Sequence, residues 1–267
     1  MAGLARKKAG TMTPAALILA GSRGEPDALC QAEAVAHKAL IEVEGVPLLA
    51  RVHAALSAAG IERIAVSCSD AEVAALARRL DCTVLEAAPG PSASVAQGFA
   101  ALGAPLLVTT ADHALLRPQW VRQFIADTPA DADVSVMLAE RHKVDIALPN
   151  SRRTWLKFAD GEWSGCNLFY LAHARAKAAL TVWSEVERNR KRPWKIAARL
   201  GVATLWLYLR GRLTLAEAVA RLGRRIGIEA RAVAAADGLA AVDVDKLADL
   251  ADVRRIAAER RASGGLG

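Results

Sequence analysis

The stretch "ALILAGSRGEPDALCQAEAVAHKALIEVEGVPLL" (residues 16–49) joins an apolar run to a small-polar loop, and Lys38 follows before apolar residues resume. An apolar run that ends in glycine is typical of a buried strand followed by a tight turn. Backbone amides in such a turn can face phosphate oxygens. The loop matches neither the dinucleotide-binding nor the P-loop glycine pattern, so alone it indicates a phosphate cradle and an ordinary strand-to-helix turn equally.

The same alternation of apolar runs and helical patterns continues to about residue 140. Runs that suit strands stand at residues 15–20, 63–68, 83–87, 105–110 and 133–138, and alanine-rich stretches with helical spacing lie between them. Continuous apolar strands alternating with helices indicate a mostly parallel sheet covered on both faces. The expected fold class is therefore α/β.

After residue 140 the pattern changes. Residues 154–171 predict a hairpin with Asp160-Gly161 at its turn, residues 173–190 a helix, and residues 228–235 a last strand before a closing helix. We expect one domain over residues 15–260, with a basic helical insert at about 174–225. The ends, residues 1–14 and 261–267, are predicted to be a flexible and a disordered tail.

The net charge of +7 is concentrated in one segment. Residues 188–231 hold twelve Lys and Arg against two acidic residues, and the remaining 23 basic and 26 acidic residues carry −3. This distribution indicates a localised anionic partner and argues against a nucleic-acid-binding fold. Its densest part could attract an anionic substrate, contact an anionic membrane surface, or form a plain solvated face; it contains Arg188, Arg190, Lys191, Arg192 and Lys195.

The cysteines and apolar stretches bear on the compartment. Cys30, Cys68, Cys82 and Cys166 are scattered without a C-x-x-C pair, which disfavours a zinc site or disulfides and favours a reducing cytoplasm. The first fourteen residues lack the apolar core of a signal peptide, and Arg210 and Arg212 interrupt the longest apolar stretch. We expect a cytoplasmic protein, with peripheral membrane contact through residues 188–231 and a homodimer through "LWLYL" as alternatives.

Polar residues follow three of the predicted apolar runs, where ligands bind in parallel sheets. Besides the Gly21 loop, Asp112 follows the fourth run, and Asp243 and Asp245 stand two apart in "VDVDK". Carboxylates at a strand end suit magnesium, and extended backbone puts Asp243 and Asp245 on one face. The plain alternatives are that Asp112 caps a turn and that Asp245 caps the next helix.

Other candidates carry weaker signals. Lys38 reads first as a surface lysine, and His37 and His113 as hydrogen-bonded loop residues. Ser92, Ser94 and Gln97 could hydrogen-bond a nucleobase, although Ser92 also suits a helix N-cap. Asn167 stands among apolar strand residues and therefore needs a hydrogen-bond partner from the backbone or a ligand.

Taken in order, these motifs resemble the nucleotidyltransferases of the molybdenum-cofactor guanylyltransferase type, the MobA-like NTP transferases. The series runs L-A-G-x-R-G, K-A-L-x-x-V-x-G-x-P-L-L, an Asp after a central strand, G-x-N-L-F and V-D-V-D-x-x-x-D-L. It covers about residues 15–171 and 226–260. The resemblance implies a Rossmann-like, three-layer domain with a mixed, mostly parallel sheet.

The resemblance also implies roles for the candidate residues. Ala20, Gly21, Ser22, Arg23 and Gly24 would hold the NTP phosphates. Lys38 would contact phosphates or the acceptor, Asp112 and Asp243 would bind Mg²⁺, "GPSASV" would recognise the base, and Asn167 would lie on the acceptor side. The implied reaction transfers an NMP from an NTP to a phosphorylated acceptor, such as a sugar-phosphate, polyol-phosphate or cofactor precursor, and releases pyrophosphate.

The chain departs from the family pattern between Gly21 and Lys38, where residues 25–36 form a longer segment that could act as a lid. Two rival functions remain. One is a nucleotide-sugar-dependent glycosyltransferase of related fold that uses "DVD" as its metal motif. The other is a non-catalytic nucleotide-binding module whose basic helices bind a membrane or a partner. Turnover of NTPs with magnesium would separate all three.

Overall fold

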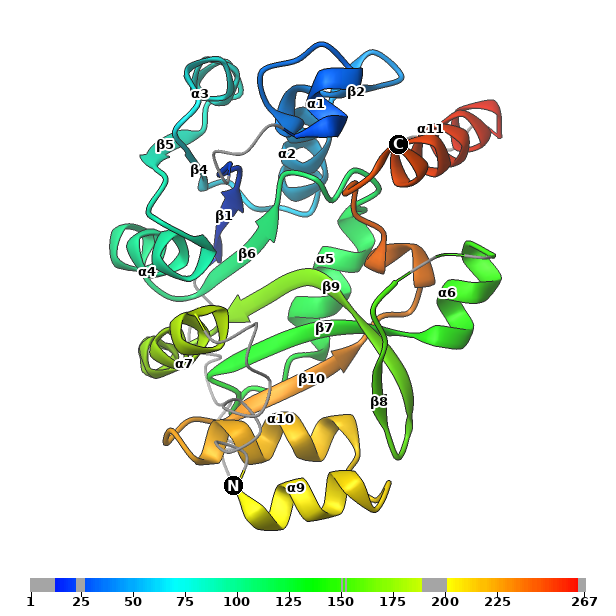
Figure 1. Ribbon diagram of the computed structural model, residues 1–267. Helices are drawn as coiled ribbons and strands as arrows, with labels where there is room; N and C mark the ends of the chain where they lie inside the picture. The colour runs from blue at the N-terminus through cyan, green and yellow to red at the C-terminus, as the bar shows by residue number, and fades with distance from the viewer. Residues whose placement is uncertain (1–12, 23–26, 150, 152, 189–200, 264–267) are drawn as a thin grey trace, which may run out of the picture.

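The computed structural model describes residues 13–22, 27–149, 151, 153–188 and 201–263. Within this part of the chain, eight strands form one sheet with the order β10-β7-β9-β6-β1-β4-β5, and β8 pairs with β9 (Figure 1). All five strands predicted before residue 140 are present. The strands are β1 (Ala15–Leu19), β4 (Ile64–Cys68), β5 (Thr83–Glu86), β6 (Leu106–Thr110), β7 (Val134–Glu140), β8 (Leu156–Phe158), β9 (Gly161–Leu171) and β10 (Ala230–Ala234).

The sheet is mixed and mostly parallel, as the family resemblance implies. Strand β1 runs parallel to β4 and β6, and β10 runs parallel to β7. The predicted hairpin exists as β8 and β9, but it is not separate from the sheet. Strand β9 continues beyond the hairpin and lies antiparallel between β6 and β7. Its apolar second half, from Leu168 to Leu171, has both neighbours it needs for burial.

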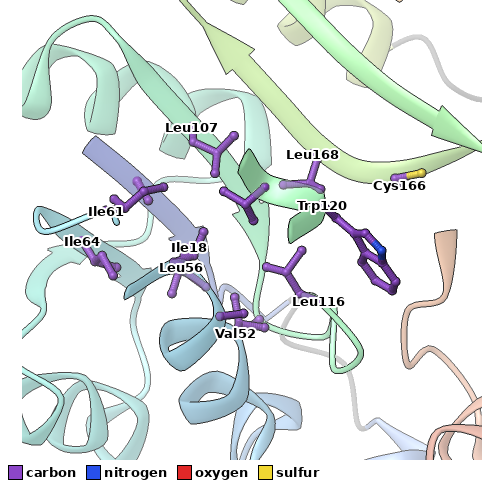
Figure 2. Close-up of a cluster of buried hydrophobic side chains, with 14 of the residues drawn as sticks. Ile18, Val52, Leu56, Ile61, Ile64, Leu107, Leu116, Trp120, Cys166 and Leu168 are labelled. Atoms are coloured by element: carbon purple, nitrogen blue, oxygen red, sulfur yellow. The ribbon is translucent and has the colours of Figure 1, made fainter. Parts of the chain in front are cut away.

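Helices cover both faces of the sheet. Alternate side chains of a strand point to opposite faces, so Ala16 and Ile18 of β1 join one core and Leu17 joins the other. The first core, shown in Figure 2, packs against α2 (Leu48–Ala58), α3 (Ala71–Arg79) and α5 (Pro118–Asp127). The second packs against α4 (Pro91–Leu102) and α7 (Lys177–Arg188). These are the three expected layers.

A third apolar cluster attaches the C-terminal helix α11 (Leu247–Ala262) to the segment after β1. Leu250, Val253 and Ile256 of α11 pack with Ile41 and Val43. The helix continues past the predicted domain end at residue 260. The cluster also includes Leu29 of α1 (Ala28–Ala32), and Leu239 of η3 (Gly238–Ala241) packs against it. Val43 belongs to the short strand β2 (Glu42–Val43), which stands between η1 (Lys38–Leu40) and β3 (Val46–Pro47) in the chain.

The described residues between β9 and β10 are mostly helical, as expected. It contains η2 (Ala174–Ala176), α7, α9 (Val202–Leu209) and α10 (Leu215–Arg224), while α6 (Arg141–Ala147) follows β7. In the described residues, no helix combines the length and apolar character needed to cross a membrane. The residues predicted as the densest basic cluster lie outside what the structure describes, apart from the backbone of Arg188. All four cysteines are buried and free.

Helix ends follow several of the expected signals. Pro118 is the first residue of α5, and Gly103 caps the C-terminus of α4. The N-cap of α4 is Gly90, so Ser92 lies inside the helix and is not its cap. The N-cap of α11 is Lys246, and the carboxylate that caps its first turn belongs to Asp249. Asp245 is therefore free of the capping role that was its alternative interpretation.

Candidate active site

The centre of the site is an ion pair between Lys38 and two aspartates from distant parts of the chain. The Lys38 ammonium lies 2.9 Å from Asp245 Oδ1 and 3.4 Å from Asp112 Oδ2. Lys38 begins η1, and His37 caps that turn by accepting a hydrogen bond from the Ala39 amide. The rigid turn holds the lysine stem between the two carboxylates, and its side chain keeps 22% of its surface exposed.

Asp112 stands directly after β6, and two backbone hydrogen bonds hold it there. Its carbonyl accepts from the amides of Ala114 and Val244, at 2.9 and 3.0 Å. The second bond joins the loop that carries Asp243 and Asp245 to the end of the central strand. Val242 and Val244 point into the third apolar cluster, so the alternating aspartates point out of it. This confirms that Asp243 and Asp245 share one face.

Asp243 is held by Arg153 and Asn167. Arg153 pairs with Oδ1 at 2.5 Å, and the Asn167 amide donates to Oδ2 at 3.0 Å. Asn167 occupies an irregular point of β9, where Cys166, Asn167 and Leu168 lie opposite the single residue Met137 of β7. Its φ of 50° is left-handed, a conformation that asparagine tolerates better than most residues. The hydrogen-bond partner that the sequence required for Asn167 is thus a site carboxylate.

The site has more acidic than basic side chains. Burial raises the pKa of Asp243 to about 6; Arg153 opposes this, and Asp112 and Asp245 add to it. Burial would lower the pKa of Lys38, but Asp112 and Asp245 together raise it above its ordinary value, so the lysine is cationic. Three carboxylates against two cations leave the pocket with excess negative charge, which favours a further cation.

The glycine loop lies at the end of β1. Ala20 is buried and donates its amide to the Ser67 carbonyl, whereas Gly21 and Ser22 are exposed. Gly21 does not adopt positive φ, and a Cβ there would only reach ordinary contact with Ala87 at 3.8 Å. Backbone conformation therefore does not explain this glycine, and its role in holding phosphates stays a prediction. Arg23 and Gly24 lie outside the described residues.

The two histidines have structural positions. His37 caps η1, and burial is the main reason that its pKa is lowered. His113 is buried against Trp120, with ring centroids 6.5 Å apart, and burial lowers its pKa to about 4. Both are therefore neutral near pH 7. His37 is hydrogen-bonded as predicted, whereas both ring nitrogens of His113 are buried without a hydrogen-bond partner among the described residues.

The residues predicted to read the base lie on α4, away from the aspartates in sequence. The Ser94 hydroxyl accepts from the Ala88 amide at 3.1 Å and so closes the loop before the helix. Ser92 is buried, and Gln97 is exposed on the helix surface. Among the described residues, no hydrogen bond or ion pair connects Ser94 or Gln97 with Lys38, Asp112 or Asp243. A base-reading role for them stays a prediction.

The described part of the segment predicted as a lid begins at Asp27 and is packed against the protein. From Asp27 onward it forms α1, whose Leu29 and Cys30 are buried. Glu33 makes two hydrogen bonds with Arg254 of α11, which lower the pKa of the carboxyl. From Asp27 the segment is thus a packed element, and residues 23–26 lie outside the described part.

One site residue, Arg153, was not predicted, and Asp245 was predicted only as the neighbour of Asp243. Arg153 precedes β8 in a stretch without a helical or strand pattern of apolar residues. Its place in the site is shown only by its ion pair with Asp243. Asp245 was named together with Asp243 because of the alternation in "VDVDK", but the family resemblance gave a role only to Asp243. Arg153 Nε and Asp112 Oδ1 are both buried without a hydrogen-bond partner. Unsatisfied polar atoms of this kind are typical of a site that completes itself with a ligand.

The residues fit a magnesium ion. Among the described residues, no three side chains of His, Cys, Asp or Glu converge as a closed metal cage. Asp112, through its unpartnered Oδ1, and Asp243 would supply the carboxylate oxygens that magnesium prefers, and phosphate oxygens and water commonly complete its shell. The arrangement suits a metal brought in with a nucleotide.

Three solved structures with a similar fold carry names of transferases. A hypothetical transferase from Thermus thermophilus has a TM-score of 0.77 and 31% identity, over 90% of this chain and 100% of that one. A nucleotidyl transferase from Methanothermobacter thermautotroptrophicus has a TM-score of 0.56 and 20% identity, over 93% and 99%. The 2-C-methyl-D-erythritol 4-phosphate cytidylyltransferase of Thermus thermophilus has a TM-score of 0.53 and 16% identity, over 92% and 100%.

The fold and the acidic site thus define the class of protein: a transferase with the nucleotidyltransferase fold. A family model for the MobA-like NTP transferase domain matches residues 16–200. The chain therefore belongs to the MobA-like NTP transferases, as its motifs predict. No curated protein matches the chain.

Proposed function

We propose that this protein is a magnesium-dependent nucleotidyltransferase, which transfers an NMP from an NTP to a phosphorylated acceptor and releases pyrophosphate. The observation that carries the proposal is the Lys38 ammonium between Asp112 and Asp245, with Asp243 beside them at the carboxyl end of the central strand. Phosphoryl and nucleotidyl transfer need positioned charges more than a covalent nucleophile, and this cluster supplies charges of both signs.

Each residue of the candidate site has a role in the proposed reaction. Lys38, with Arg23 and the amides of the Gly21 loop, offsets the negative charge that develops on the phosphates. Asp112 and Asp243 hold magnesium, which acts as a Lewis acid toward the α-phosphate when it is bound. Asp245 keeps Lys38 charged and oriented until a nucleotide competes for the ammonium.

Arg153 and Asn167 define the acceptor side. Both reach Asp243 from the region around β8 and β9. The Arg153 guanidinium has a buried Nε without a partner, and guanidinium groups bind phosphate well. The Arg153 guanidinium therefore supports the proposal that the acceptor carries a phosphate. The cytidylyltransferase of similar fold, whose name specifies a polyol phosphate, is consistent with that class.

The test begins with the donor. A thermal-shift panel of ATP, CTP, GTP and UTP with MgCl₂ identifies the nucleotide, and pyrophosphate release is then measured with sugar-phosphate and polyol-phosphate acceptors. We expect turnover with one NTP. Turnover only with a nucleotide sugar would favour the glycosyltransferase, and binding without turnover would favour the non-catalytic module.

The metal ligands are tested by Asp112→Ala and Asp243→Ala. We expect each substitution to abolish pyrophosphate release and to leave the far-UV circular dichroism spectrum unchanged. The matched control is Asp81→Asn, because Asp81 is exposed and its φ of 57° is also accessible to asparagine. Full activity in either site variant would exclude the two-aspartate magnesium site.

A further inference from the structure

Helix α9 presents its apolar side chains to solvent and its polar side chain to the protein. Val202, Trp206 and Leu209 are 86%, 49% and 74% exposed, whereas Thr204 is buried. The three exposed residues have i, i+4, i+7 spacing and therefore form one stripe, called here the α9 stripe. A surface helix of a soluble domain has the opposite polarity, so the α9 stripe needs a partner.

The orientation of α9 is set by packing. Tyr208 meets Phe158 of β8 edge-on, with ring centroids 6.0 Å apart. The turn after α9 is tied to the same hairpin, because Ala159 donates its amide to the Leu213 carbonyl and Leu215 donates to Asp160 Oδ1. The hairpin thus packs against one side of α9, and the α9 stripe lies on a different side of the helix.

Arginines stand at both ends of the α9 stripe. At the C-terminal end, the Arg210 guanidinium lies 4.7 Å from the Trp206 ring centroid, and Arg212 follows. At the N-terminal end, Arg225 approaches Gly201 so closely that a Cβ there would overlap its guanidinium. Within residues 201–231, Arg221 and Arg231 are paired with acidic residues, whereas Arg210, Arg212 and Arg224 have no carboxylate partner in the described structure.

From this pattern we infer that the α9 stripe, together with Arg210, Arg212 and Arg224, docks the protein on the surface of an anionic lipid bilayer. The apolar side chains would enter the interface, and the guanidinium groups would meet lipid phosphates. With eight residues, α9 is far too short to span a bilayer and suits a helix lying in its plane.

Charge and geometry disfavour other occupants. Two copies paired through α9 in parallel would set Arg210 and Arg212 against the same residues of the second copy. A nucleic acid would leave the central apolar stripe uncovered. Figure 1 shows α9 and α10 below the sheet, at the end opposite α1 and α11. Docking through α9 would therefore leave the nucleotide site open, and the inference does not depend on the proposed reaction.

The experiment is sedimentation of the full chain with vesicles of phosphatidylcholine alone or mixed with phosphatidylglycerol. We expect binding to the mixed vesicles that weakens as salt is raised. Arg212→Gln with Arg224→Gln should weaken it about 25-fold, because each basic side chain near an anionic surface contributes about fivefold. Val202→Ser with Leu209→Ser should weaken it about tenfold or more.

Matched controls carry the same changes elsewhere. Ile146→Ser removes an apolar side chain that is 78% exposed on α6, and Arg78→Gln with Arg79→Gln removes two exposed charges at the end of α3. Both should bind vesicles as the native chain does. The inference is overturned if the native chain ignores anionic vesicles or if the α9 variants bind like the controls. A dimer that dissociates in Val202→Ser with Leu209→Ser, without vesicle binding, would assign the stripe to a second copy.

Discussion

Lys38 and Asp245 are 207 positions apart in the chain and 2.9 Å apart in space, Nζ to Oδ1. The contact closes the site by joining the segment after β1 to the loop before α11. Asp112, at the end of β6, completes the triangle through Lys38. The stability of this cluster depends on the Lys38 ammonium lying between two carboxylates. Removing the ammonium or one of the carboxylates therefore has a predictable effect on the site.

The first prediction concerns Lys38. Lys38→Met removes the ammonium that offsets phosphate charge, and pyrophosphate release should fall by roughly 100-fold or more, the usual loss for one electrostatic contact to the transition state. Lys38→Arg should retain part of the activity because it keeps the charge. The control is Lys157→Met on β8, whose side chain is 76% exposed. Equal rates for Lys38→Met and Lys157→Met would remove Lys38 from the mechanism.

The second prediction concerns pH. The pKa of Asp243 is raised to about 6 in the folded protein from an ordinary value of 3.8, chiefly by burial. The folded state therefore binds more protons than the unfolded state between about pH 4 and 6, and the contribution of Asp243 to stability falls as pH rises through this window. Magnesium needs the carboxylate, so its stabilising effect should grow over the same window.

Thermal unfolding with and without MgCl₂ and NTP, from pH 5 to pH 7.5, measures this effect. The shift in Tm caused by magnesium and NTP should be small at the acid end and reach a plateau above about pH 6 to 7. The Asp243→Asn variant should lose the pH-dependent part. A magnesium-induced shift in the native chain that is constant across the range would contradict the assignment of Asp243 as a ligand.

Local patterns predicted much of this site, since strands end where apolar runs end. That rule placed Asp112 and the Gly21 loop at one edge of the sheet, and the alternation in "VDVDK" placed Asp243 and Asp245 on one face. The motif resemblance singled out Lys38. Local patterns did not show that β9 lies between β6 and β7, because long-range strand pairing depends on the whole sheet. Arg153 escaped prediction for the same reason, since its partner is 90 positions away.

The third prediction concerns Gly238, the first residue of η3. A Cβ at this position would overlap the backbone carbonyl of Lys143 and the amide nitrogen of Val144 in α6. Backbone cannot move aside as a side chain can, so Gly238→Ala should destabilise the fold by about 1–3 kcal/mol in urea unfolding. It should also weaken binding of magnesium and NTP, because η3 leads directly into Asp243.

Gly165→Ala is the matched control. Gly165 lies in β9 near the same region, but a Cβ there would meet open space. Its free energy of unfolding should stay within about 0.5 kcal/mol of the native value, the range of surface substitutions away from special features. If Gly238→Ala is as stable as Gly165→Ala, the contact between α6 and η3 is not tight.

The last prediction separates two properties of Asn167, its left-handed backbone and its amide. At a φ of 50°, glycine has no steric cost, whereas an alanine Cβ costs about 1–2 kcal/mol. Asn167→Gly and Asn167→Ala both remove the hydrogen bond to Asp243 Oδ2. The stability difference between the two variants therefore measures the backbone strain, and any loss of activity that they share measures the amide.

We expect Asn167→Ala to be less stable than Asn167→Gly by about 1 kcal/mol in urea unfolding. Both variants should release pyrophosphate more slowly by about tenfold or more, because a carboxylate that has lost an orienting partner binds metal less well. Asn167→Asp tolerates the backbone but places a second carboxylate against Asp243, and it should be less active than Asn167→Gly. Native activity in the glycine variant would show that the irregularity in β9 serves the backbone alone and that Arg153 is sufficient to orient Asp243.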